Sequence, residues 1–68
     1  MKITVELLPA RRETTMDLSP GSNGLDLTKL LGIAPDVHIL VRNDLPIPID
    51  EELHDNDVIR IISVVSGG

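Results

Sequence analysis

The last apolar run of the chain, residues 58–65, constrains the fold more than any other segment. It reads Val-Ile-Arg-Ile-Ile-Ser-Val-Val, which puts apolar side chains on both faces of an extended strand. A strand that is apolar on both faces suits the middle of a sheet. The run therefore predicts a central strand, and Ser66, Gly67 and Gly68 follow it directly.

Composition limits the classes of partner. The 68 residues suffice for one small domain, and the apolar fraction of 41% contains no Phe, Tyr or Trp. The core must therefore be aliphatic, and base-stacking platforms or aromatic ligand cages are excluded. A net charge of −5 disfavours nucleic acid and membranes as partners and favours a basic protein surface. With no apolar stretch of membrane-spanning length, no signal peptide and no Cys, we expect a cytoplasmic protein.

The first half of the chain predicts a hairpin and a short helix. Residues 2–8 and 12–18 alternate between apolar and polar positions around a turn at 9–11, as in a β-hairpin. Leu27, Leu30 and Leu31 then follow at helical spacing, and we expect Leu30 to be buried in the core. Asn23 is suited to begin this helix and Gly32 to end it.

The second half predicts the remaining strands. Residues 37–42 alternate and end at a turn formed by Asn43 and Asp44, while two prolines confine residues 45–49 to an edge strand or an irregular crossing. An acidic connection, residues 50–57, leads into the last strand. The helix must cover one face of the sheet, because each element has to bury its apolar side.

Alternation also predicts an exposed apolar patch on the other face of the sheet. In the last strand Ile59 and Ile61 share one face, whereas the charged Arg60 indicates that the opposite face is exposed to solvent. By the same reasoning Leu40 points outward between His38 and Arg42. We therefore expect a partner-docking patch, ringed in part by His38, that contains Leu40, Arg42, Arg60, Ile62 and Val64. The alternative is a scatter of surface aliphatics, which is normal in soluble proteins.

Other candidate sites are weak. The acidic stretch 50–57 lacks the ligand spacing of a calcium loop, and His38 and His54 form no ligand pattern. Ser63 and Ser66 have neither a nucleophile elbow nor a paired base. We therefore expect no metal site and no catalytic activity of the chain itself.

Four segments together resemble the ThiS/MoaD family of sulfur carriers, which are relatives of ubiquitin. They are the opening strand 2–5, the helix end 30–33, the strand ending at Asn43, and residues 53–58 with their strand and the terminal Gly67-Gly68. The family usually has Asp-Gly-Asp before the last strand, where this chain has Asn56, a residue that tolerates the left-handed conformation. The last residues before the glycines lack the proline of molybdopterin-synthase small subunits, which makes them more similar to a thiamine-type carrier.

The resemblance implies an α+β fold of the β-grasp, or ubiquitin-like, type. In such a fold a mixed four- to five-stranded sheet carries one short helix packed on one face, and the last strand lies beside the first. Residues 1–65 would form this domain. Residues 66–68, comprising Ser66, Gly67 and Gly68, would form a flexible C-terminal tail.

The resemblance also implies a chemistry in which the chain is substrate rather than enzyme. A ubiquitin-activating-type enzyme would use ATP and magnesium to adenylate the Gly68 carboxylate, and sulfide or a persulfide would displace AMP to leave a thiocarboxylate. A sulfur-accepting synthase would then use that sulfur for thiamine, molybdopterin or tRNA thiolation. No cofactor would be bound permanently. Two alternatives stay open: a ubiquitin-like modifier joined to lysines through Gly68, and a plain protein-interaction domain.

Overall fold

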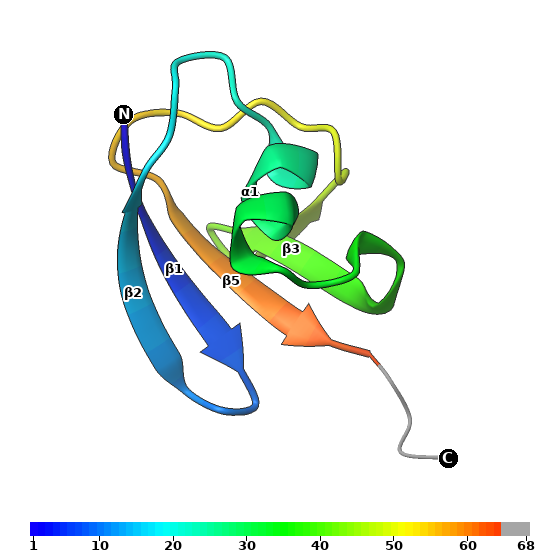
Figure 1. Cartoon of the computed structure of the whole chain (residues 1–68). Coiled ribbons are helices and arrows are strands. Elements are labelled where there is room, and N and C mark those ends of the chain that lie inside the picture. Colours follow the sequence, from blue (N-terminus) through cyan, green and yellow to red (C-terminus); the bar gives the residue numbers. More distant parts are fainter. Residues whose placement is uncertain (65–68) are drawn as a thin grey trace.

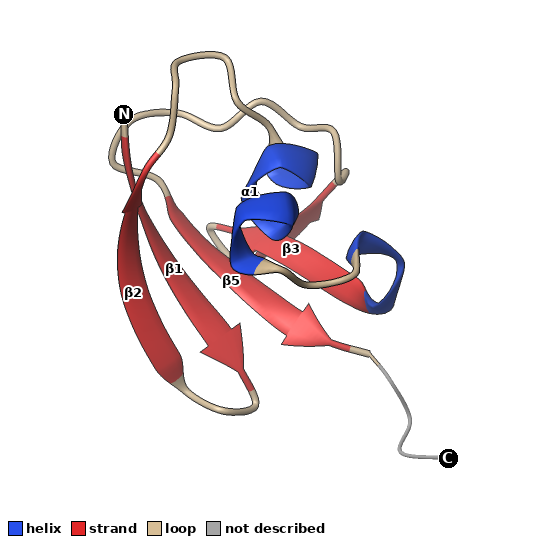
Figure 2. Ribbon diagram, in the orientation of Figure 1, coloured by secondary structure: helices blue, strands red, loops and turns tan. Residues whose placement is uncertain are grey.

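The computed structural model describes residues 1–64, which form a five-stranded mixed sheet with one α-helix packed on one face (Figures 1 and 2). The elements in chain order are β1 (Lys2–Leu8), β2 (Arg12–Asp17), α1 (Gly24–Leu31), the short 3-10 helix η1 (Pro35–Val37), β3 (His38–Arg42), β4 (Leu45–Ile47) and β5 (Val58–Ser63). Their order across the sheet is β2-β1-β5-β3-β4.

The last strand, β5, lies at the centre of the sheet, as its apolar sequence predicts. It pairs in parallel with β1 and antiparallel with β3. The pairs β1–β2 and β3–β4 are antiparallel hairpins. The sheet therefore consists of two hairpins joined through β5, and this arrangement confirms the β-grasp fold.

Turn chemistry fixes the ends of these elements. Asn43 and Asp44 both have positive φ, 52° and 65°, which is the backbone of a two-residue hairpin turn and confirms the predicted turn. Asn56 has a φ of 69°, so it adopts the left-handed conformation expected of the residue that replaces the family's glycine. The predicted edge strand is shorter than expected and ends at Ile47.

The helix α1 begins and ends as predicted. The Asn23 side chain accepts a hydrogen bond from the Asp26 amide, and the Asp26 carboxylate accepts one from the Asn23 amide, which makes a capping box. Gly32 ends the helix in the left-handed conformation. At Gly24 any side chain would collide with the Ile49 carbonyl oxygen and with Leu40, so the first turn can approach the 48–52 crossing closely only because this residue is glycine.

Leu30 is a correction to the predicted core. It is 61% exposed, whereas Leu27 is fully buried. Gly24, Leu27, Thr28 and Leu31 define the inward side of α1, and at 100° per residue Leu30 points roughly 110° away from it. The leucine spacing identified the helix correctly but not which of its leucines faces inward. The buried core consists of Ile3, Val5, Leu18, Leu27, Leu40, Leu53, Ile59 and Ile61.

Candidate functional site

The face of the sheet opposite α1 carries a group of aliphatic side chains from three strands. The register places Ile62 opposite Ile39 of β3 and beside Leu8 of β1, and it places Arg60 opposite Val41. Ile39 is 42% exposed, Val58 57% and Val64 49%, and Ile62 is half-buried. We call this group the outer patch, and its members are Leu8, Ile39, Val41, Val58, Ile62 and Val64.

Leu40 does not belong to the outer patch, which corrects the sequence-based expectation. Its side chain is 2% exposed and lies opposite fully buried Ile61, on the face that α1 covers. The alternation of β3 was therefore identified correctly, but its two faces were exchanged. Ile39 occupies the outward position that was assigned to Leu40.

Arg42 also faces inward rather than toward a docking partner. Its Nη2 lies 2.8 Å from Asp57 Oδ2 and donates to the Glu52 carbonyl oxygen at 2.7 Å, and its Nη1 lies 3.3 Å from Glu51 Oε2. The side chain is 16% exposed. A charged residue tolerates such an environment when carboxylates surround it. Arg42 thus ties β3 to the 51–57 loop.

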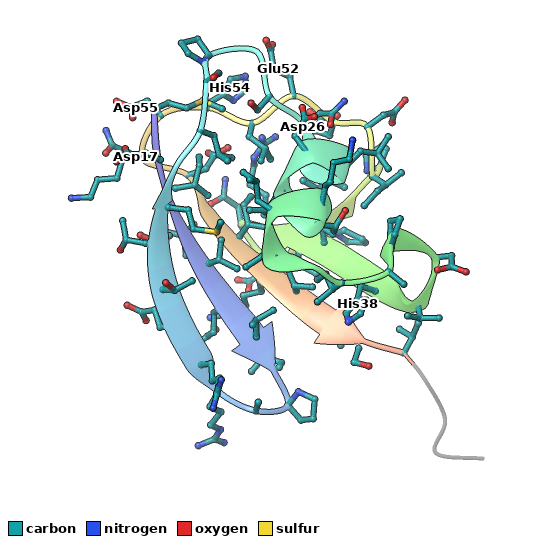
Figure 3. The ribbon with its side chains drawn as sticks, viewed as in Figure 1. Asp17, Asp26, His38, Glu52, His54 and Asp55 are labelled. Atoms are coloured by element: carbon teal, nitrogen blue, oxygen red, sulfur yellow. The ribbon has the colours of Figure 1, made fainter. Side chains whose placement is uncertain are left out.

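His38 shares the inward side of β3 and does not ring the outer patch. Its Nδ1 lies 2.6 Å from the carbonyl oxygen of Ala34, close to η1. Figure 3 shows His38 near the end of β5, whereas Glu52, His54 and Asp55 lie in the loop at the opposite end of the sheet. The two histidines are therefore far apart in space as well as in sequence.

Arg60 lies on the outer face, where the sequence analysis placed it. Its Nε is 3.0 Å from Glu6 Oε1 and its Nη1 is 3.2 Å from Asp44 Oδ1, with the side chain 51% exposed. A shallow depression beside it is lined by Val41, Asn43, Asp44, Val58 and Arg60. The one cation within this apolar surface is thus already paired with carboxylates among residues 1–64, which lowers the cost of covering the surface with a partner.

Part of the outer patch lies at the end of the sheet where β1 and β5 both end, as their ribbons show in Figure 1. Because β1 and β5 are parallel, Leu8 and Ile62 lie at the same end of the sheet, and the Val64 amide continues the ladder by donating to Val37 at 2.9 Å. The predicted tail residues Ser66, Gly67 and Gly68 lie outside the described residues. A partner seated on the outer patch would therefore contact Val64, the last residue that the structure describes.

The acidic loop uses its carboxylates for internal hydrogen bonds. Asp55 Oδ1 accepts from the Lys2 amide at 2.7 Å, and Asp57 Oδ2 accepts from the His54 amide at 2.8 Å. Within residues 1–64 no three His, Cys, Asp or Glu side chains are grouped as metal ligands. In the same part of the chain, neither helix has the length and apolar character needed to cross a membrane.

Sequence reasoning missed four members of the outer patch: Leu8, Ile39, Val41 and Val58. For β3 the missing signal was the role of Arg42. A charged residue indicates the solvent-exposed face of a strand only if no carboxylates are available to pair with it on the buried face. The acidic stretch 50–57 contained those carboxylates. Had Arg42 been paired with them, Ile39 and Val41 would have been assigned to the outside.

The strand order, the single helix and the central last strand define a ubiquitin-like β-grasp protein. The chain is similar in structure to SAMP1 from Haloferax volcanii, with a TM-score of 0.74 and 19% identity over 100% of both chains. It is also similar to Caldiarchaeum subterraneum ubiquitin, with a TM-score of 0.73 and 17% identity over 100% of this chain and 98% of that one. No curated protein sequence matches the chain.

The ThiS family matches residues 4–68, and the chain belongs to the ThiS family. This membership places it among the small ubiquitin-like sulfur carriers and modifiers, which are typically not enzymes themselves. Such proteins work with an activating enzyme and with acceptors.

Proposed function

We propose that this protein is a sulfur carrier whose reactive group is the C-terminal carboxylate of Gly68. The observation that carries the proposal is the family match, which includes the terminal Gly67-Gly68 pair. Glycine has no side chain to obstruct a narrow channel, so a Gly-Gly end can enter the active site of a partner enzyme.

In the proposed reaction a ubiquitin-activating-type enzyme uses ATP and magnesium. A Gly68 carboxylate oxygen attacks the α-phosphorus of ATP, which forms the acyl adenylate and releases pyrophosphate. Sulfide then attacks the acyl carbon and AMP leaves, so the chain ends in a thiocarboxylate. No step needs a thiol of this chain, which has no Cys. A sulfur-accepting synthase would use the product for thiamine, molybdopterin or tRNA thiolation.

The outer patch is the proposed docking surface for the activating enzyme. Three of its residues are at least 42% exposed, namely Ile39, Val58 and Val64, and Val64 is the last residue that the structure describes. A partner must hold the folded body while the chain end enters its active site. Arg60, paired with Glu6 and Asp44, would give that contact a fixed polar centre among aliphatic neighbours.

The intact mass of the protein purified from its native cells tests the proposal. A mass increase equal to one sulfur-for-oxygen exchange is the expected result, followed by a further increase of one alkyl group when an alkylating reagent that traps thiocarboxylates converts the end to a thioester. Attachment of the chain to larger proteins would favour the alternative of a ubiquitin-like modifier. An unmodified chain under sulfur-demanding growth would contradict both and leave a plain interaction domain.

A further inference from the structure

The two borders of the sheet differ in how open they are. β4 has only three residues, Leu45–Ile47, and contains Pro46, which has no amide hydrogen to donate. β2 has six residues and no proline, and it pairs with β1 in a continuous register without a bulge. Edge strands are usually shortened, interrupted or covered, because their free backbone groups can pair with another chain. β2 is neither short nor interrupted, and it forms the free border seen in Figure 2.

The hydrogen bonds of Leu18 show which backbone groups of β2 face outward. The Leu18 amide donates to the Met1 carbonyl at 2.8 Å, and the Met1 amino group donates to the Leu18 carbonyl at 2.7 Å. These two residues therefore form a hydrogen-bonded pair, and such pairs alternate along an antiparallel ladder. The amides and carbonyls of Met16 and Thr14 consequently face β1. Those of Glu13, Thr15 and Asp17 point away from the sheet.

The side chains along this border are acidic on the outer face. Glu13 lies directly opposite Glu6, and Asp17 lies opposite Lys2. Among residues 1–64 neither Glu13 nor Asp17 has an ion-pair contact. The Glu6 carboxylate is paired with Arg60, so a cation placed beside Glu13 on the open side of β2 would give the Glu13 carboxylate an ion-pair partner of its own.

On the other face, a groove lies between the end of β2 and α1. It is lined in part by Leu18, Ser22, Lys29 and Leu30, and Leu30 is the 61% exposed leucine of the helix. Met16 of β2 is half-buried against the core on the same face. An apolar side chain opposite Met16 on a neighbouring strand would point to the side of the sheet that carries α1 and its exposed Leu30.

We propose that β2 is a docking edge for an extended basic segment of a partner protein, which adds to the sheet as a sixth strand. The segment pairs with the outward backbone groups of Glu13, Thr15 and Asp17 and carries two cations four residues apart, opposite the two carboxylates. The residues between them alternate, so that apolar side chains turn toward Met16 and Leu30. A second copy of this chain is a poorer occupant, because it brings the same carboxylates and a net charge of −5. This surface is separate from the outer patch and does not depend on the chemistry at Gly68.

The test is a titration of the isotope-labelled full chain with the peptide acetyl-Ser-Arg-Val-Thr-Val-Arg-Ser-amide, followed by amide chemical shifts. In antiparallel register its two Arg residues lie opposite Asp17 and Glu13, and its Thr lies opposite Thr15. We expect the amides of residues 12–18 and of Leu30 to shift. Shifts centred on the outer patch, or no saturable shifts at all, would overturn the proposal.

Two matched sets of probes separate strand addition from general attraction to an acidic protein. N-methylation of the peptide Thr removes an amide that faces β2 and should abolish the shifts, whereas N-methylation of the preceding Val blocks an amide that faces away and should leave them. Reversing the edge charges with Glu13→Arg and Asp17→Arg should weaken binding roughly tenfold and favour a peptide with Glu in place of Arg. Asp36→Arg with Asp50→Arg makes the same change of net charge elsewhere on the surface and should preserve binding.

Equal binding of both methylated peptides, or equal weakening by both charge pairs, would contradict strand addition at β2. The variants change exposed side chains, and thermal melts show whether each remains folded. Sedimentation of the chain without peptide tests the remaining possibility, that a second copy of the chain occupies the β2 edge. Dimerisation that Thr15→Pro abolishes would assign the edge to a second copy and overturn the basic-peptide assignment.

Discussion

Arg42 and Arg60 lie one on each face of the sheet, and their surroundings make them energetically different. Arg42 is 16% exposed and contacts Asp57, Glu51 and the Glu52 carbonyl. Its Arg42→Ala variant leaves those groups without their cation, and we expect a loss of roughly 1.5–3 kcal/mol in the free energy of unfolding. Arg60→Ala removes two exposed ion pairs and should cost about 0–1 kcal/mol. Chemical denaturation of both variants checks this, and an equal cost would contradict the inward role of Arg42.

The two leucines of α1 make a second comparison at the residue scale. Leu27 is fully buried, so Leu27→Ala should destabilise the protein by roughly 2–5 kcal/mol. Leu30 is 61% exposed, so Leu30→Ala should change stability by less than about 0.5 kcal/mol. Thermal melts of the two variants decide the phase of the helix. If Leu30→Ala proved the more damaging, α1 would have to be rotated on the sheet.

At the scale of the element, one face of β5 packs in the core and the other face contributes to the outer patch. Ile59 and Ile61 are fully buried, whereas Ile62 lies on the outer patch. Ile61→Asp should unfold the chain, because it would bury a charge in the core. Ile62→Asp should cost only about 1 kcal/mol in stability, because Asp is a poor strand former, but should weaken binding to the activating enzyme by about 2 kcal/mol or more. Melts and a pull-down with that enzyme measure both effects, and the reverse pattern would exchange the two faces.

β3 shows where sequence-based prediction stops. Alternation gives the period of a strand, and it was right for β1, β2, β3 and β5, as were the helix caps and the turns at Asn43 and Asn56. It does not say which of the two sets faces the core. For β5 the choice was clear, because the inner set is Ile59 and Ile61. For β3 each set contains aliphatic residues, and the choice depended on partners of Arg42 that come 9 to 15 residues later in the chain: the carboxylates of Glu51 and Asp57 and the backbone carbonyl of Glu52.

The candidate site was likewise predicted in part. Arg60, Ile62 and Val64 lie on the outer face, as the sequence analysis expected, although Ile62 is half-buried; Leu40 and Arg42 lie on the inner face instead. Whether the surface docks a partner remains a prediction. The Gly68 assignment depends on the family match, because no periodicity or packing argument bears on a residue beyond the last strand.

For the whole molecule, the body and the chain end should be separable. The core cluster ends at Ile61, so a chain without Gly67 and Gly68 should keep its free energy of unfolding within about 0.5 kcal/mol. It should nevertheless fail to accept AMP from ATP in the presence of the activating enzyme, because the Gly68 carboxylate is absent and the new chain end is two residues shorter. Radiolabelled AMP transfer measures this. Transfer that persists in the shortened chain would show that Gly68 is not the acceptor.

The central place of β5 has a consequence for synthesis on the ribosome. Until residues 58–63 have emerged, the hairpins β1–β2 and β3–β4 have no strand between them to join them into one sheet. The core residues Ile3, Val5 and Leu40 then lack the neighbours that β5 supplies. A product interrupted earlier therefore has no closed core, and it exposes the aliphatic surface that chaperones and proteases recognise. Only a chain translated as far as β5 becomes compact. A compact chain has therefore been translated through β5, the strand that shortly precedes the carboxylate on which the proposed chemistry depends.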